Sequence, residues 1–276
     1  MRIRYRLFTA LAGVVLAFTA VTAHAQALQE GRLLLATQVL NDAVASRDQG
    51  IPERLLQRAY GIAVIPGFTK VAFFFGGARG HGVLVVRNRD GRFSSPVFVS
   101  LTGGSFGFQW GVQKADLVLV FTSRKGVEGI TGGKLTLGAD VSVAAGPVGR
   151  QATAATDQAF NAGVYSYSHT AGVFAGLALS GAALTIDDSS NADFYRRPGL
   201  LASEIISGSV SSDDDAARRF MTAVFQSTGV QPASSVASSA PAAAATAPAA
   251  PARPSGPAAQ AFPLQDCSPG SNPNPN

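Results

Sequence analysis

The chain has 276 residues, of which 46% are hydrophobic, with 30 glycines, 15 prolines and one cysteine. This length allows one large or two small domains. A single cysteine, Cys267, excludes a core held together by internal disulfides. Basic residues outnumber acidic ones by 22 to 17, but without the three arginines at positions 2, 4 and 6 the numbers are 19 and 17, a net charge of +2.

Residues 1–25 have the pattern of a secretory signal peptide. The three arginines precede an apolar run, Leu7–Ala20, and Ala23–Ala25 fits the A-x-A cleavage pattern. The apolar run is shorter than the about 20 residues that span a membrane, so we prefer cleavage before Gln26 to an uncleaved anchor. The sequence therefore predicts an exported protein, periplasmic or peripherally membrane-associated in a bacterial cell envelope.

The charges are distributed unevenly along the chain. Gly61–Arg150 contains ten basic and four acidic residues, a net charge of +6, whereas Gln151–Val230 contains four and eight, a net charge of −4. Basic surface on an exported protein favours anionic lipid headgroups or other polyanions over nucleic acid. The alternative is that these charges are scattered over the outer faces of strands.

Two helices are predicted before the first strand. Gln26–Arg47 is amphipathic and ends near Gly50. Its predicted apolar stripe consists of Leu28, Leu34, Leu35, Val39, Leu40 and Ala43. Because the charges of this helix sum to zero, packing on the chain's own sheet is favoured over lying on a membrane. Pro52 is suited to open a second, short helix with an inner face of Leu55, Leu56 and Ala59.

From Ile62 to Ile186 the sequence is rich in glycine and has the period-two alternation or short apolar runs of β-strands. The predicted strands are Ile62–Ile65, Val71–Phe75, Val83–Arg87, Pro96–Leu101, Phe106–Gln113, Leu117–Phe121, Val164–Tyr167, Val173–Leu179 and Ala182–Ile186. Asp90-Gly91 predicts a hairpin turn. Gly132–Arg150 predicts further strands with tight turns at Gly138 and Gly146.

Three shorter segments complete the expected fold. A short helix is predicted at Lys125–Ile130, a helical turn at Asn191–Arg196, and a helix at Asp213–Gln226 whose first residues are acidic. From Gln231 onward alanine, proline and serine dominate, which predicts disorder. We therefore expect a signal peptide over 1–25, an α+β domain over 26–230 with a Gly-rich antiparallel sheet or barrel packed by N-terminal and C-terminal helices, and a disordered tail over 231–276.

No residue pattern in the chain specifies catalysis. Gly103–Gly107 fits G-x-S-x-G, but a strand pattern follows where a nucleophile requires a helix. His81 and His169 lack the further ligands of a zinc site, and Asp187-Asp188 lacks the glycine and distal glutamate of a calcium loop. Ala145–Arg150 could present N–H groups and a guanidinium to a phosphate, although a hairpin turn is the commoner structure. We expect no enzyme, no cofactor and no metal site.

A series of longer segments runs in order from residue 59 to residue 195. They are Ala59–Pro66, Gly76–Gly82, Pro96–Gln113, Asp116–Phe121, Gly133–Arg150, Tyr165–Ser168, Gly172–Gly176 and Asn191–Tyr195. Together they resemble the SYLF lipid-binding domain family of bacterial exported proteins and eukaryotic membrane-trafficking and actin-patch proteins. The resemblance implies an α+β binding module. Eukaryotic relatives bind phosphoinositides, partly through a basic amphipathic N-terminal helix, and yeast relatives bind and bundle actin filaments.

The chain departs from these relatives in its charge-neutral N-terminal helix and in having no recognisable SH3 or FYVE pattern. The resemblance therefore implies binding of anionic phospholipid at a membrane surface. The predicted contacts, chosen for charge near the matching glycine motifs, are Lys134 and Arg150, followed by Lys70, Arg79, Arg124 and Lys125. Two alternatives are an envelope protein-interaction scaffold with the tail as spacer, and an outer-membrane-associated structural β protein, to which the Phe106–Val112 alternation points.

Overall fold

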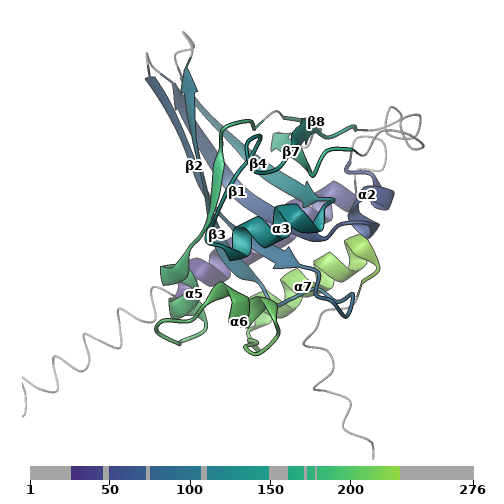
Figure 1. Cartoon of the computed structure of the whole chain (residues 1–276), viewed down its shortest axis with the longest axis vertical. Helices are drawn as coiled ribbons and strands as arrows, with labels where there is room; N and C mark the ends of the chain where they lie inside the picture. The colour runs from purple at the N-terminus through teal and green to yellow at the C-terminus, as the bar shows by residue number, and fades with distance from the viewer. Residues whose placement is uncertain are drawn as a thin grey trace, which may run out of the picture. The chain divides into compact units, whose positions relative to one another are not determined.

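The computed structural model describes residues 26–45, 50–72, 75–106, 111–148, 161–170, 173–177 and 179–230 (Figure 1). All of them belong to one compact unit, Met1–Ser239. The predicted signal peptide, the predicted tail and Arg150 lie outside the described residues, so the statements about them stay predictions.

Nine strands form one curled sheet, which together with the helices confirms the predicted α+β class. The strands are β1 (Gly61–Ala72), β2 (Phe75–Val86), β3 (Val97–Phe106), β4 (Gly111–Phe121), β5 (Lys134–Thr136), β6 (Val143–Ala145), β7 (Val164–Thr170), β8 (Val173–Gly176) and β9 (Ala183–Ile186). Their order is β5-β9-β3-β2-β1-β4-β7-β6, with β8 paired to β7. All pairs are antiparallel except β6 with β7.

The sheet curls because its two end strands are consecutive in the chain. Seven strand spacings separate β5 from β6, which would place them about 34 Å apart in a flat sheet. The six residues of the connection, 137–142, span about 25 Å at most. The two ends must therefore approach one another, and a bridge between Leu137 and Val141 tightens the connection. The strands predicted within Gly132–Arg150 thus correspond to β5 and β6, which pair with β9 and β7.

Helices cover both faces of the sheet. They are the N-terminal helix (residues 26–45), α2 (Glu53–Gln57), α3 (Arg124–Thr131), α5 (Asp188–Phe194), α6 (Ala202–Ile206) and α7 (Asp215–Thr228). The N-terminal helix, α2 and α7 share one apolar cluster with alternate residues of the central strands. The residues between them, on the other face, cluster with α3 and α6. Among the described residues, no helix is both long and apolar enough to cross a membrane.

The N-terminal helix buries only part of the predicted stripe, namely Val39, Leu40 and Ala43. Leu33, Ala36 and Leu40 are buried, with Gln29 and Ala43 on the same side. Three leucines of the predicted stripe are instead exposed: Leu28 (66%), Leu34 (45%) and Leu35 (54%). The sequence contains two overlapping apolar stripes. On the same helix, Arg32 reaches Asp187 and Ser190.

Two strand predictions are also wrong in their boundaries. The predicted strand Ile62–Ile65 does not end at Pro66-Gly67. This dipeptide is a bulge inside β1, because both neighbours of β1 shift register there and Gly67 takes φ +61°. The predicted single strand Phe106–Gln113 contains the end of β3 and the start of β4, which lie three places apart in the sheet. Residues 107–110 of that segment lie outside the described part of the chain.

Other local predictions are confirmed. The hairpin at Asp90-Gly91 joins β2 to β3, with Gly91 at φ +79°. The helices predicted near Lys125, Asn191 and Asp213 correspond to α3, α5 and α7, with N-caps at Ser123, Asp187 and Asp214. The short helix α6 was not predicted.

Candidate functional site

A polar row crosses four neighbouring strands on one face of the sheet. Residues directly opposite in an antiparallel pair project from the same face. The row consists of Lys134 in β5, Thr185 in β9, Ser100 in β3 and His81 in β2.

A second row lies two residues further along the strands and thus on the same face. It consists of Thr102 in β3, Arg79 in β2, Thr69 in β1 and Lys114 in β4. We call these two rows together the cationic face. Arg79 and Lys114 are exposed and two strands apart, a spacing of about 10 Å between their backbones.

The cationic face begins where the helices stop covering the sheet. Along β2, alternate positions carry Arg79 and His81 and then the buried Val83 and Val85. β4 repeats the change, with Lys114 followed at alternate positions by Asp116 and the buried Val118. In Figure 1 the long strands β1 and β2 extend past the helices at this end. On this half of the strands, Arg79, Lys114 and Thr102 are exposed.

The cations of this face are available to a ligand. Within the described residues, the side chains of Lys134, Arg79 and Lys114 make neither a hydrogen bond nor an ion pair. The neighbouring threonine hydroxyls donate instead to backbone carbonyls: Thr69 to Gly67, Thr102 to Ala183 and Thr185 to Ser100. An anion on this face would thus be held by the positive charges.

His81 connects the cationic face to the N-cap of α5. Its Nδ1 lies 3.0 Å from Ser100 Oγ and 3.4 Å from Asp187 Oδ2. Both contacts use the same nitrogen, whereas a nucleophile relay requires one contact at each ring nitrogen. The Ser-His-Asp grouping therefore lacks the geometry of a catalytic triad.

The Asp187 carboxylate is held in its charged form. Burial alone would raise the pKa of Asp187, but hydrogen bonds from Ser190 and Ser189 and the charge of Arg32 outweigh burial and lower this pKa below its ordinary value. Ser190 donates to the carboxylate from both its hydroxyl and its backbone N–H, and Arg32 Nη1 lies 3.4 Å from Oδ2.

His169 in β7 and Asp116 in β4 are directly opposite each other, on the same sheet face as Lys114. Nδ1 of His169 lies 3.5 Å from Asp116 Oδ2 and has no hydrogen-bond partner although it is buried. The imidazole stacks on Phe174 with 4.4 Å between ring centroids. Asp116 also accepts a hydrogen bond from Gly67 N at the β1 bulge.

The structure brings together only some of the predicted lipid contacts. Lys134 and Arg79 share the cationic face, whereas Lys70, opposite Ala78, projects from the other face. Arg124 lies over the Tyr60 ring, 5.7 Å from its centroid, and Lys125 follows it at the start of α3. Arg150 lies outside the described residues. Lys114 and His81 were missed, although alternation along their strands marks them.

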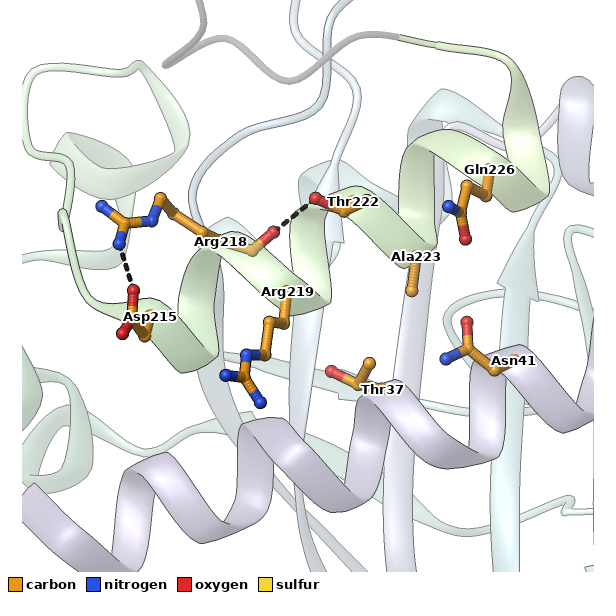
Figure 2. Close-up of a pocket in the computed structure, with 8 residues that line it drawn as sticks. All are labelled: Thr37, Asn41, Asp215, Arg218, Arg219, Thr222, Ala223 and Gln226. Carbon is orange, nitrogen blue, oxygen red and sulfur yellow. Dashed lines mark hydrogen bonds and ion pairs between the residues drawn. The ribbon is translucent and has the colours of Figure 1, made fainter.

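A second polar site is a groove of about 530 Å³ between the N-terminal helix and α7 (Figure 2). It is lined by Thr37, Asn41, Asp215, Arg218, Arg219, Thr222, Ala223 and Gln226. Arg218 forms an ion pair with Asp215, and Figure 2 shows Arg219 projecting toward the N-terminal helix. The groove thus offers fewer free cations than the sheet face, because one of its two arginines already has an acidic partner.

In the described part of the chain, the curled sheet carries helices on its apolar half and exposed cations on its polar half. Among the described residues, no group of three His, Cys, Asp or Glu side chains is placed to hold a metal ion. Residues 102–227 match the family Ysc84, described as "Las17-binding protein actin regulator". This match confirms the predicted resemblance to the SYLF (Ysc84) family over residues 102–227.

Three proteins of known organisms are similar to this chain. "LAS seventeen-binding protein 3" of Saccharomyces cerevisiae is 36% identical over 180 residues, 64% of this chain and 39% of the relative. "Protein YSC84" of the same yeast is 37% identical over 165 residues, 59% and 35% of the two chains. "SH3 domain-containing YSC84-like protein 1" of Xenopus laevis is 33% identical over 164 residues, 59% and 49%. The chain thus matches less than half of each of these relatives.

Proposed function

We propose that this chain is a non-enzymatic module of the cell envelope that binds anionic phospholipid at a membrane surface through the cationic face. The observation that carries the proposal is the pair Arg79 and Lys114, exposed on one sheet face without an ion-pair partner among the described residues. Membranes offer phosphates at high density over a broad surface, which suits cations distributed across several strands. The family match, whose named members are binding or regulator proteins, supports a binding role.

The expected strength of binding follows from the number of free cations. Each Lys or Arg close to an anionic membrane contributes about 1 kcal/mol. Lys134, Arg79 and Lys114 would therefore contribute about 3 kcal/mol together, which gives reversible binding. Because exposed charges are screened beyond about 10 Å at 0.1 M salt, binding should weaken as salt is added.

Vesicle co-sedimentation tests this proposal. The chain from Gln26 to Asn276, which contains every described element, is mixed with neutral vesicles and with vesicles containing phosphatidylglycerol, at low and high salt. We expect pelleting with the anionic vesicles at low salt only. The double variant Arg79→Glu with Lys114→Glu should lose this pelleting while its circular dichroism stays unchanged.

A matched control is the double variant Arg218→Glu with Arg219→Glu, which makes the same change of charge in the inter-helix groove. It should pellet as the unmodified chain does. If this control loses binding and the sheet-face variant keeps it, the groove is the headgroup site and the assignment to the cationic face is wrong. Pelleting that ignores salt and both double variants would contradict the electrostatic proposal as a whole.

A second candidate function is docking of a protein partner, as expected for an envelope scaffold. The observation that favours it is the exposed leucine surface of the N-terminal helix, Leu28, Leu34 and Leu35. Exposed apolar patches of this kind mark interaction sites. The variant Leu28→Ser with Leu35→Ser should then lose the envelope proteins that cross-link to the unmodified chain, while vesicle binding persists. Cross-linked partners that are the same for both chains would contradict this candidate.

A further inference from the structure

A second group of cations lies at the other end of the sheet from the cationic face. β1 begins where β2 and β4 end, and the register pairs Gly61 with the last residues of both strands. The segments at these strand ends are residues 53–60, 87–92 and 123–128, which contain seven basic and three acidic residues, a net charge of +4. We call the basic residues the arginine cluster: Arg54, Arg58, Arg87, Arg89, Arg92, Arg124 and Lys125.

Tyr60 joins the three segments of the arginine cluster. Its carbonyl oxygen accepts a hydrogen bond from Arg87 N at 2.7 Å, and its own N–H donates to Phe121 O at 2.7 Å. The guanidinium of Arg124 lies over the Tyr60 ring, 5.7 Å from its centroid. Arg58 precedes Tyr60 by two residues and is exposed. Arginines of three different segments are therefore gathered around one residue.

The charge of Arg87 is not neutralised by the described part of the chain. Its Nη2 donates to the carbonyl oxygen of Gln57 at 2.9 Å, and its guanidinium lies 5.2 Å from the centroid of the Phe93 ring. Its Nε is buried without a hydrogen-bond partner. None of the cations of the cluster forms an ion pair with a described carboxylate. A half-buried charge without a counter-ion is costly, and a bound anion would supply one.

The composition of the cluster favours phosphate as the anion. An arginine fork matches the oxygens of a carboxylate or a phosphate, whereas lysine acts as a point charge. A planar carboxylate fills one such fork. A phosphate presents oxygens in several directions, so it suits arginines that come from three segments. A polymer with repeated phosphates suits seven cations spread over all three.

The helices separate the arginine cluster from the cationic face. Arg79 and Arg87 are eight residues apart along one extended segment, about 27 Å, and project from the same side of the sheet because alternate positions share a face. Val83 and Val85, between them, are buried under helices, which are about 10 Å thick. One flat membrane therefore cannot reach Arg79 and Arg87 together.

We propose that the arginine cluster binds a phosphate-rich polyanion from the aqueous phase, at a site separate from the cationic face. Arg124 and Lys125, predicted from the sequence as lipid contacts, then belong to this polyanion site. A chain held on a membrane by the cationic face would also hold the polymer. This linking role rests on the lipid-binding function proposed above, whereas the polyanion site itself does not.

Binding of long-chain inorganic polyphosphate to the chain used for co-sedimentation tests the site. The double variant Arg58→Glu with Arg124→Glu changes two exposed arginines of the cluster. It should raise Kd at least about tenfold, because each lost charge-assisted hydrogen bond corresponds to about a tenfold change. The sheet-face double variant and the groove control described above make the same change of charge elsewhere and should bind polyphosphate nearly as the unmodified chain does.

Three results would overturn the site. Equal losses in all three double variants would show attraction by net charge alone. Tighter binding of poly-glutamate than of polyphosphate, at matched length, would assign the cluster to acidic protein segments. If Arg58→Glu with Arg124→Glu loses as much vesicle binding as the sheet-face variant does, the phosphate is that of the lipid headgroup and the cluster is not a separate site.

A measurement on the unmodified chain guards against misfolding of the variants. Polyphosphate should shift the Nε–H NMR signals of Arg87 and Arg124 and leave that of Arg79 unchanged. The reverse pattern would overturn the assignment to the cluster.

Co-sedimentation tests the linking role. The unmodified chain should carry polyphosphate into the pellet with phosphatidylglycerol vesicles. The sheet-face variant should leave it in solution because this variant does not reach the vesicles, and the cluster variant because it does not hold the polymer. Selective polyphosphate binding without vesicle binding rejects the lipid function and the link but leaves the polyanion site standing. Vesicle binding without polyphosphate binding rejects only the present inference.

Discussion

Asn191 of α5 makes with Phe98 of β3 the pair of hydrogen bonds that a neighbouring strand would make. Phe98 N donates to Asn191 Oδ1 at 2.8 Å, and Asn191 Nδ2 donates to Phe98 O at 3.1 Å. The pairing of β3 with β9 ends at Val99, so the side chain of Asn191 continues the ladder where the strand partner stops. This contact gives Asn191, the first residue of the segment Asn191–Tyr195, a structural role.

Replacing Asn191 by Ala should therefore destabilise the domain by about 1–3 kcal/mol, because Phe98 N is left buried without a partner. Phe98 O keeps the N–H of Asp187 as a donor. The measurement is the urea midpoint of unfolding. Asp193→Ala, at an exposed position of the same helix, is the control and should shift the midpoint little. Equal midpoint shifts for the two variants would contradict the role of Asn191.

Two leucines of the N-terminal helix, Leu33 and Leu35, test which side of this helix faces the core. Leu33→Ala should lower the free energy of unfolding by about 2–5 kcal/mol, because Leu33 is fully buried. Leu35→Ala removes the same atoms from an exposed position and should change it by less than about 0.5 kcal/mol. Chemical denaturation of the two variants measures both changes in the free energy of unfolding. A larger loss for Leu35→Ala would restore the stripe predicted from the sequence.

Two glycines of β2 differ in the room that they have for a side chain. A Cβ at Gly82 would lie 2.2 Å from the carbonyl oxygen of Val64, because the β1 bulge brings that backbone close. Gly82→Ala should cost at least about 1–3 kcal/mol, since the clash is with main chain and not with a flexible side chain. Gly77→Ala meets nothing within 4 Å and should leave the melting temperature nearly unchanged. Similar melting temperatures for both variants would exclude this close approach.

The Asp187 carboxylate should stabilise the domain in a pH-dependent way. Its pKa in the folded chain lies below the unfolded value, which is ordinarily about 3.9. Its stabilising effect is therefore complete above that unfolded value and is lost as the pH falls through the lower folded value. Asp187→Asn, which retains a capable N-cap, should be about 1–2 kcal/mol less stable than the unmodified chain at pH 7.

The stability difference between these two chains should shrink in acid. Urea midpoints at pH 7 and near pH 2.5 measure it. Asp215→Asn removes a carboxylate from an exposed ion pair with Arg218 and should have little effect at either pH. A difference for Asp187→Asn that persists unchanged in acid would show that the charge of Asp187 is not its source.

Local sequence signals predicted most of the elements but not their neighbours. Asp90-Gly91 fixes its hairpin by turn chemistry, and the acidic residues before α7 supply its N-cap, so both follow from a few adjacent residues. The sheet order does not follow in this way. β5 and β6 end on opposite sides of the sheet because of pairings with β9 and β7, which are distant in sequence. The bulge at Pro66 likewise depends on Asp116, which binds Gly67 N.

The candidate site, too, could be predicted from local sequence only in part. Lys134 and Arg79 were chosen for their charge near glycine motifs, and only strand register reveals that they share a face. Lys114 was not among the residues chosen in this way. Correct alternation along β4 would have grouped Lys114 with Asp116 and Val118.

The contact between Arg32 and Asp187 has a consequence for the order of folding. The two residues are separated by 155 positions. At about 5–20 residues per second, a ribosome needs about 10–30 s to make that stretch. The N-terminal helix is therefore synthesised long before Asp187, the ion-pair partner of its Arg32. The core strands β1 to β4 are made in this interval, so the apolar packing of the helix can precede the ion pair, and a chain truncated before Asp187 would lack that ion pair.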